Sequence, residues 1–471
     1  MKHIFIFSLL ITGFTFSSCQ DWLDVKPKTS VNEEDLFSRE IGFKEALTGI
    51  YVQMAGTDMY GRQLSYGLPD RLAQRYNDHR MSATFYNFSG ETHKAAMKTI
   101  WERGYNIIAN VNNMLEWIEK RPQVIATVGY HDIIKGEALG LRAFMYFDLL
   151  RMWGPIYKEN PTSPAIAYRS QFNREDKNLA PANVVLDSIV SDLQRAEVLL
   201  VNDPMHIEFP SGANRGSGGD PFLQRRFKRM NLYAVKALLA RVYLWKGDKA
   251  NAARYAREVI AANDDRGRRF KLVTDNTYDL IYSTEILFSL SVNNFDVQVA
   301  NDFNFNNATY YVDSRGRVEE MFNTSNDGVN DMRFREGQGF QLTVFNGCTR
   351  KYEQQGLYSD AIKKTVPLIR LSEMYYIVAE CSNDLSESAY LISEVCAARG
   401  MDNVLPFGNE EERLERLNVE YRKEFYAESQ YWYFLKRHFY KTFLFCPIDN
   451  MEEENYRFTL PDDEKVLGNM D

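Results

Sequence analysis

The chain has 471 residues, of which 45% are hydrophobic, 14% aromatic and 25% charged, and its formal net charge is −8. This composition supports a large folded core and excludes a disordered chain, while the length alone allows two or three domains of ordinary size. The acidic balance argues against a nucleic-acid partner, because binding to phosphates needs a basic face.

The N-terminus has the features of a lipoprotein export signal. Lys2 precedes an apolar run, Ile4 to Phe16, that is too short to span a bilayer of about 30 Å, and two serines precede Cys19. We expect residues 1–18 to form a signal peptide, Cys19 to carry a lipid, and residues 19–31 to act as a tether. The alternative is an ordinary secretory peptide with an incidental cysteine. No later apolar run approaches the ~20 residues of a spanning helix, so the lipid is the only membrane contact that we expect.

Helical periodicity dominates the chain after the tether. Asn32 and the three carboxylates after it favour a helix start, and apolar residues then recur at helical spacing as far as Met54. Long helices are predicted from about Lys94 to Lys120 and from about His131 to Trp153, with a proline or a glycine just beyond each end. The second of these contains small residues that would let a neighbouring helix approach closely, namely Gly136, Ala138, Gly140 and Ala143.

Three later segments are also predicted to be helical. The segment from Ala237 to Ile260 turns at Gly247-Asp248, and its small and aromatic residues match a tetratricopeptide helix hairpin. A second hairpin is predicted from Ile369 to Arg399, and a further helical segment from Glu411 to Arg437. Paired helices of this kind form a grooved surface that suits a protein partner.

Two less regular regions interrupt the helices. Pro204 to Asp220 has the composition of a loop, and Phe270 to about Tyr358 is rich in turn-forming and aromatic residues, with strand-like stretches such as ILFSLSV. We therefore predict an all-α dominated fold, in which tetratricopeptide-like hairpins form a scaffold with long irregular loops and a few short strands. Residues 32–471 are predicted to be a single body, with ligand binding in the loop-rich region of about 270–358.

The sequence contains none of the common catalytic motifs that we sought. Its six histidines form no HExxH site, and it has no GxSxG elbow, phosphate-binding loop or dinucleotide fingerprint. Glu424 and Glu428 share one predicted helix face, but basic neighbours favour an ion-paired role for them over acid–base catalysis. We expect no enzymatic activity, no catalytic residue, no metal site and no cofactor.

Two other residue sets are given structural roles. Cysteines beyond the lipidation site are expected to be small buried hydrophobes, with a disulfide as the alternative; these are Cys348, Cys381, Cys396 and Cys446. A local basic cluster is expected to be a solvated face; it comprises Arg225, Arg226, Lys228 and Arg229.

Two segments combine aromatic rings with polar side chains, the mixture that binds sugars and some peptides. In the first segment the predicted ligand-binding residues are Tyr66, Asp70, Arg75, Tyr76, Asn77 and Tyr86. In the second they are Phe303, Phe305, Tyr310 and Tyr311. Core packing is the alternative for any single ring, so binding is predicted for the two segments as regions.

The order of these segments resembles the SusD/RagB family of nutrient-uptake lipoproteins. The matching pieces are CQDWLDVKPKT after the signal, GFKEALTGIY, GEALGLRAFMYFDLLRMWGP, KALLARVYLWKGD, RLSEMYYIVAE and EYRKEFYAESQYWYFLKR. The chain departs from the family pattern at Glu428-Ser429, where a Glu-Gly pair is common, and at Tyr431 and Phe434, which stand in place of an Arg and an Asp.

The resemblance implies a lipoprotein of the outer membrane, lipid-anchored and facing the outside of the cell. It would bind an oligomeric nutrient and deliver it to a SusC-like TonB-dependent transporter, which it would cover as a lid. A glycan is the expected nutrient, and a peptide is the alternative within the same family. A surface glycan hydrolase is the alternative from another class and would need two carboxylates across a cleft. A purely structural partner of the transporter is the third possibility.

Overall fold

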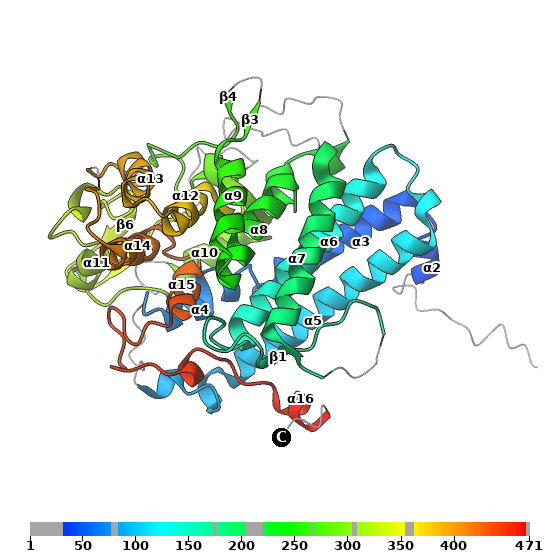
Figure 1. Cartoon of the computed structure of the whole chain (residues 1–471), viewed down its shortest axis with the longest axis horizontal. Coiled ribbons are helices and arrows are strands. Elements are labelled where there is room, and N and C mark those ends of the chain that lie inside the picture. The colour runs from blue at the N-terminus through cyan, green and yellow to red at the C-terminus, as the bar shows by residue number, and fades with distance from the viewer. Residues whose placement is uncertain are drawn as a thin grey trace, which may run out of the picture.

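Helices make up most of the structure, which is a computed structural model (Figure 1). It describes residues 32–76, 83–173, 178–203, 220–264, 267–303, 309–353, 362–402 and 404–467. The predicted all-α dominated scaffold with few short strands is confirmed. The predicted signal peptide, lipidated Cys19 and tether lie outside the described residues, as do Asn77 and Phe305. Among the described residues, no helix has both the length and the apolar character that crossing a membrane requires.

The first half of the chain forms a layer of helices of very different lengths. They are α2 (Glu33–Leu36), α3 (Glu40–Met54), α4 (Leu68–Leu72), α5 (Glu91–Lys120), α6 (Tyr130–Trp153) and α7 (Ala182–Leu199). The two long helices predicted here are confirmed to within three residues, and both end just before the predicted breakers. Helix α6 packs against α5 and α7, so it lies at the centre of this layer.

The second half continues the scaffold with helical hairpins. Its helices are α8 (Leu232–Lys246), α9 (Lys249–Ile260), α10 (Phe295–Asp302), α11 (Arg315–Met321), α12 (Leu371–Cys381), α13 (Leu385–Ala398), α14 (Glu410–Glu424), α15 (Gln430–His438) and α16 (Asp462–Leu467). Helix α9 packs on α8 and on α12, and α12 packs on α13, so the two predicted hairpins lie next to each other. Figure 1 shows them as a continuation of the α5–α7 layer.

Local sequence explains the tight turn between α8 and α9. Gly247 ends α8 in the left-handed region, with φ of 84°, which glycine adopts without steric cost. The next residue, Asp248, accepts a hydrogen bond from the backbone N–H of Asn251 at 3.0 Å and so caps α9. Because one residue stops the first helix and the next starts the second, the two helices leave the turn already paired.

The C-terminal helical segment is broken, although the sequence predicted one helix from Glu411 to Arg437. Ala427 and Ser429 adopt positive φ values of 61° and 62°, and this separates α14 from α15. The Ser429 hydroxyl donates to the carbonyl of Ser65 at 2.8 Å, and its N–H donates to Asp70 at 3.3 Å. Ser429 therefore adopts the conformation expected of the glycine common at this position, at a cost of about 1 kcal/mol.

The strands form four antiparallel pairs among the described residues. These are β1 (Pro164–Ile166) with β2 (Ala180–Pro181), β3 (Asn263–Asp264) with β4 (Gly267–Arg268), β5 (Ile286–Ser291) with β8 (Thr365–Arg370), and β6 (Phe340–Leu342) with β7 (Gly347–Thr349). The predicted strand in ILFSLSV is β5. Its partner β8 leads directly into α12, with Ile286 opposite Arg370 and Ser291 opposite Thr365. This pair joins the two ends of the loop-rich region to the scaffold.

The expectation that the basic cluster forms a solvated face is wrong for Arg226, which is fully buried. Its guanidinium pairs with Asp203 at 2.8 Å and with Glu137 of α6. A carboxylate on a helix as enclosed as α6 needs such a partner, because an unpaired buried charge is costly. Lys228 is half-buried, and burial together with Arg225 lowers its pKa to about 8.

The four described cysteines are all free thiols, as expected. Cys348, Cys381 and Cys396 are buried, and Cys446 is half-buried. Burial raises the pKa of Cys348 to about 11 and those of Cys381 and Cys396 to about 12. These three thiols therefore act as small hydrophobic side chains and not as nucleophiles.

Candidate functional site

The two segments predicted to bind ligand meet in space. We call their contact the aromatic junction, which comprises Tyr66, Tyr76, Phe303, Tyr310, Tyr352 and Tyr426. The ring centre of Tyr66 lies 5.1 Å from that of Phe303, and Tyr76 lies 4.9 Å from Tyr310. These separations are typical of interacting aromatic pairs. Residues far apart in the sequence are thus held together by ring packing.

A polar network ties the aromatic junction to α10. Arg62 donates two hydrogen bonds to Asp302, from Nε at 2.9 Å and from Nη2 at 2.6 Å. The Tyr66 hydroxyl donates to the same carboxylate at 3.0 Å, and Gln298 donates to the carbonyl of Gly61 at 2.6 Å. Burial and the Asp302 charge raise the pKa of Tyr66. The network therefore fixes the turn around residue 62 against the end of α10.

The rings of the aromatic junction face the interior. Tyr66 is fully buried, and Tyr76, Tyr310 and Phe303 are 2%, 5% and 8% exposed. Core packing, the alternative given for single rings, therefore describes these four, because a ligand on the surface would meet almost none of their area. Ligand contact at this place stays a prediction for its rim, where Tyr311 is half-buried and the Arg62 side chain is 33% exposed.

The other predicted residues of the first segment are also buried. Burial raises the pKa of Asp70 to about 7. Arg75 donates to the carbonyl of Arg422 at 2.5 Å and lies over the Tyr426 ring at 4.7 Å. The Tyr86 hydroxyl donates to the carbonyl of Leu72 at 2.6 Å. The structure therefore gives these three side chains positioning contacts that hold the segment against α14 and α15.

The predicted ion-paired role of Glu424 and Glu428 is confirmed, but the pairs lie in the core and not on the surface. Glu424 accepts hydrogen bonds from Arg370 and Arg399 at 2.6 Å each and from Arg333 at 2.8 Å. Although burial acts in the opposite sense, these three cations hold the pKa of Glu424 well below its usual range. Glu428 pairs with Arg370 at 2.9 Å. A carboxylate locked in its charged form cannot act as a general acid near neutral pH.

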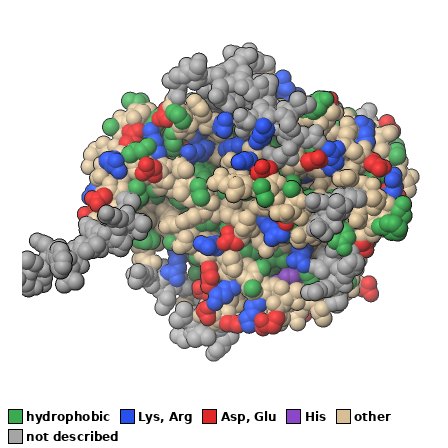
Figure 2. Space-filling view, turned by 180° about the vertical axis from the view of Figure 1, so that it is seen from behind, with side chains coloured by type: hydrophobic (Ala, Val, Ile, Leu, Met, Phe, Trp, Pro, Cys, Tyr) green, Lys and Arg blue, Asp and Glu red, His purple; other side chains and the backbone are tan. Residues whose placement is uncertain are grey.

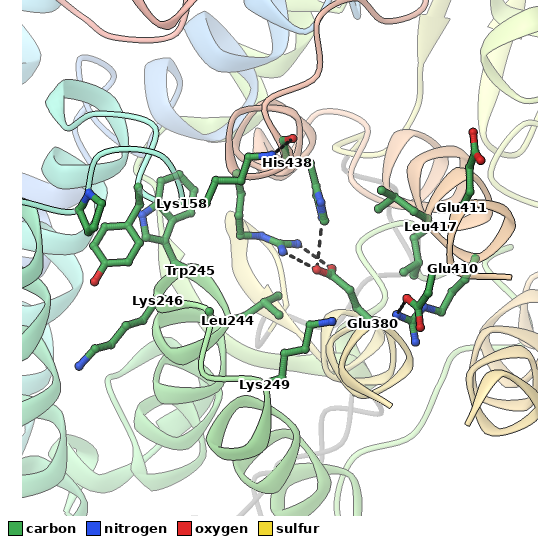
Figure 3. A pocket seen from close by; sticks show the side chains of 16 residues that line it. Lys158, Leu244, Trp245, Lys246, Lys249, Glu380, Glu410, Glu411, Leu417 and His438 are labelled. Carbon is green, nitrogen blue, oxygen red and sulfur yellow. Dashed lines mark hydrogen bonds and ion pairs between the residues drawn. The ribbon is translucent and has the colours of Figure 1, made fainter. Parts of the chain in front are cut away.

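Two surface hollows adjoin the start of α14, and the sequence analysis did not identify either. The first has a volume of about 750 Å³ and lies between the α8–α9 turn, α12, α14 and the end of α15 (Figure 3). The second has a volume of about 1,070 Å³ and lies on the side of α14 that faces residues 323–326. Residues from at least three separate segments of the chain form each hollow, so no single sequence motif marks them.

The surface elsewhere has mixed character. On the face that Figure 2 shows, charged side chains of both signs are interspersed, and apolar side chains are scattered among them. Within the described ranges, no group of three or more His, Cys, Asp or Glu residues has the arrangement of a metal site.

Two family models together match most of the chain. The model described as "Starch-binding associating with outer membrane" matches residues 21–213, and the SusD family model matches residues 229–467. Two curated relatives from Formosa agariphila are SusD-like protein P25, 24% identical over 217 residues, and SusD-like protein P38, 26% identical over 206 residues. These alignments cover 43% and 42% of this chain, but only 38% of P25 and 37% of P38.

Solved structures share the fold over nearly the whole chain. A SusD superfamily protein from Bacteroides vulgatus has a TM-score of 0.70 and 19% identity, and the match covers 92% of this chain and 98% of that one. A SusD superfamily protein from Bacteroides thetaiotaomicron has a TM-score of 0.64 and 21% identity, with coverages of 85% and 89%. A laminarin-binding SusD-like protein has a TM-score of 0.57 and 17% identity, with coverages of 85% and 91%. Identities this low show a common fold alone.

Proposed function

Since the chain belongs to the SusD family, we propose that it is a lipid-anchored surface protein that binds an oligomeric glycan and delivers it to a partner TonB-dependent transporter. The observation that carries the proposal is the match of family models to both halves of the chain, one of them described by starch binding at the outer membrane. The laminarin-binding protein with the same fold supports a glycan over a peptide.

Capture without cleavage is the role that fits the described carboxylates best. Glu424 ends α14 and Glu428 lies in the break before α15, and arginines neutralise both in the core. A glycosidase needs one carboxyl group that holds a proton and a second that faces it across the substrate. Asp70, whose pKa is about 7, is fully buried and so is not open to a substrate.

We place the ligand face on the exposed rings of the loop-rich region. Phe345 is 81% exposed at the tip of the β6–β7 hairpin, and Tyr278 is 58% exposed. The Thr343 hydroxyl accepts hydrogen bonds from the N–H groups of Phe345 at 3.2 Å and of Asn346 at 3.0 Å, so the tip is held in one shape. An exposed ring on a rigid turn is suited to stacking on the CH face of a sugar.

The test is affinity electrophoresis and calorimetry of residues 20–471 with laminarin, starch, xylan, pectin and a mixed peptide digest, followed by product analysis. We expect saturable binding of at least one polysaccharide that stays intact. Phe345→Ala should weaken it about tenfold, the loss of about 1.4 kcal/mol. Tyr390→Ala is the matched control, because Tyr390 is a 61% exposed ring on α13 and not part of the loop-rich region. Binding only of peptides would replace the glycan, and ligand breakdown would overturn non-enzymatic capture.

The anchor and the partner need separate tests in the full chain. Labelled fatty acid should enter the wild-type protein and not Cys19→Ala. Affinity purification of the anchored protein from outer membranes should recover a TonB-dependent transporter. Recovery of the protein alone, under conditions that keep other outer-membrane complexes intact, would contradict delivery by direct contact.

A further inference from the structure

We propose that the two hollows beside the start of α14 form one elongated binding site for an oligosaccharide, separate from the aromatic junction and from the β6–β7 tip. The inference rests on the proposed glycan-binding function. Glu411, Leu414 and His438 line both hollows, so the hollows meet along the α14 surface. Volumes of about 750 and 1,070 Å³ place each in or near the range of small-molecule sites, and together they exceed it. A ligand that fills both has several sugar units.

The first hollow combines an apolar floor with fixed polar groups. Leu244 and Trp245 at the end of α8 contribute the floor and are each 6% exposed. Lys249 extends into the hollow toward Glu380, as Figure 3 shows. Glu380 is held by Arg437, with Nη2 to Oε2 at 2.7 Å, and it lies 3.2 Å from Nε2 of His438.

The charge state of Glu380 in the first hollow is fixed as well. Burial alone would raise the pKa of Glu380, but the neighbouring Arg437 and His438 hold this pKa well below its usual range. Glu380, which is 5% exposed, therefore stays charged at neutral pH at the back of the hollow, and the exposed Lys249 is the donor that a ligand can reach. Sugar hydroxyls need donors and acceptors that are already in place, because each hydroxyl both gives and accepts a hydrogen bond.

The second hollow is richer in amide groups than the first. Asn326 donates to the side-chain oxygen of Asn323 at 2.6 Å, which orients both amides. Asn323 itself has a positive φ of 55°. Tyr440, which is half-buried, also lines this hollow. Oriented amides beside a ring are the groups that bind the hydroxyls and the CH face of one sugar unit.

An oligosaccharide fits these walls better than a peptide does. The residues that line the hollows come from helices and turns, so the described part of the site offers no strand edge to pair with an extended peptide backbone. Leu417, which also lines the first hollow, is fully buried, so the floor provides little area for an apolar anchor. Acidic, basic and amide side chains form much of the rest of the walls, with apolar residues such as Pro161 and Val419 between them.

The test uses a triple variant confined to exposed positions, Lys249→Ala, Glu411→Ala and Asn326→Ala. Its matched control is Lys120→Ala, Glu119→Ala and Asn202→Ala, which removes the same residue types from exposed positions near the ends of α5 and α7. The probes are laminarin, starch, xylan and pectin in affinity electrophoresis, and then calorimetry with the polysaccharide that the wild type retains. We expect the triple variant to bind it at least tenfold more weakly and the control to bind within twofold.

Three other outcomes count against the proposal in different ways. If the wild type binds a polysaccharide and the triple variant binds it equally well, the hollows are not a glycan site, although the proposed function stands. If the wild type binds none of the four, both fail. If Asn326→Ala alone weakens binding of short and long oligosaccharides equally, the two hollows are not one elongated site, because a short ligand would occupy only one of them.

Discussion

The close packing of α6 against the end of α7 can be tested with one added methyl group. A Cβ at Gly136 would lie 2.7 Å from Cγ of Leu200 and 3.2 Å from Cβ of Leu199. Leu200 is fully buried and has little room to move, so we take the steric cost from the upper part of the overpacking range, about 2–3 kcal/mol. Replacing glycine with alanine inside a helix gains about 1 kcal/mol. We therefore expect Gly136→Ala to lose about 1–2 kcal/mol.

The matched control is Gly49→Ala. Gly49 lies inside α3, and a Cβ there would meet nothing within 4 Å. This variant should gain up to about 1 kcal/mol from helix propensity alone. The difference between the two variants isolates the steric cost, because the propensity gain cancels, and we expect a gap of about 2–3 kcal/mol. Urea unfolding of residues 20–471 followed by circular dichroism measures it. Equal midpoints for the two variants would refute the packing argument.

Three further predictions concern buried polar groups. Glu424→Gln should lose about 3–5 kcal/mol of stability in urea unfolding, because the substitution leaves the buried Arg370 and Arg399 without enough negative charge. The control is Glu102→Gln, at a side chain that is 58% exposed, and it should change the stability little. The second prediction concerns Glu420. Burial alone would raise its pKa, but Lys423 and Arg333 lower this pKa from 4.5 to about 2. Its charged form should therefore contribute about 3 kcal/mol to the free energy of unfolding, in full above pH 4.5 and progressively less as the pH drops toward 2. An unfolding midpoint that is constant from pH 6 to 3 would contradict this. Tyr66→Phe should lower thermal stability by about 1–2 kcal/mol, since a buried carboxylate loses a donor; an unchanged melting temperature would contradict this.

Much of the scaffold was predictable from local sequence. Apolar residues at helical spacing predicted α5 and α6, and Gly247-Asp248 predicted the turn between α8 and α9, because caps and periodicity are properties of neighbouring residues. The break between α14 and α15 was missed. It depends on Ser429 in a conformation that serine seldom adopts, and on a hydrogen bond to Ser65, which is distant in the sequence.

The candidate site was predictable only in part. The two segments of the aromatic junction were each singled out as regions that mix rings with polar groups, but their contact with each other was not predicted. Their burial was not visible, because Tyr66 and Tyr310 have the same composition signal on a surface as in a core. The ion network of Glu424 was also hidden, since its partners Arg370 and Arg399 lie in a strand and after another helix. The hollows combine helix ends that only the tertiary fold brings together.

The antiparallel pairing of β5 with β8 has a consequence for how such a protein can change during evolution. Ser291 lies opposite Thr365, so the long segment between them leaves and re-enters the scaffold at adjacent points, about 5 Å apart. Insertions or deletions within the segment need not move either end. Arg333, inside the segment, connects it to Glu424 of the scaffold. Selection can therefore change the length and sequence of this segment while the helical hairpins stay the same.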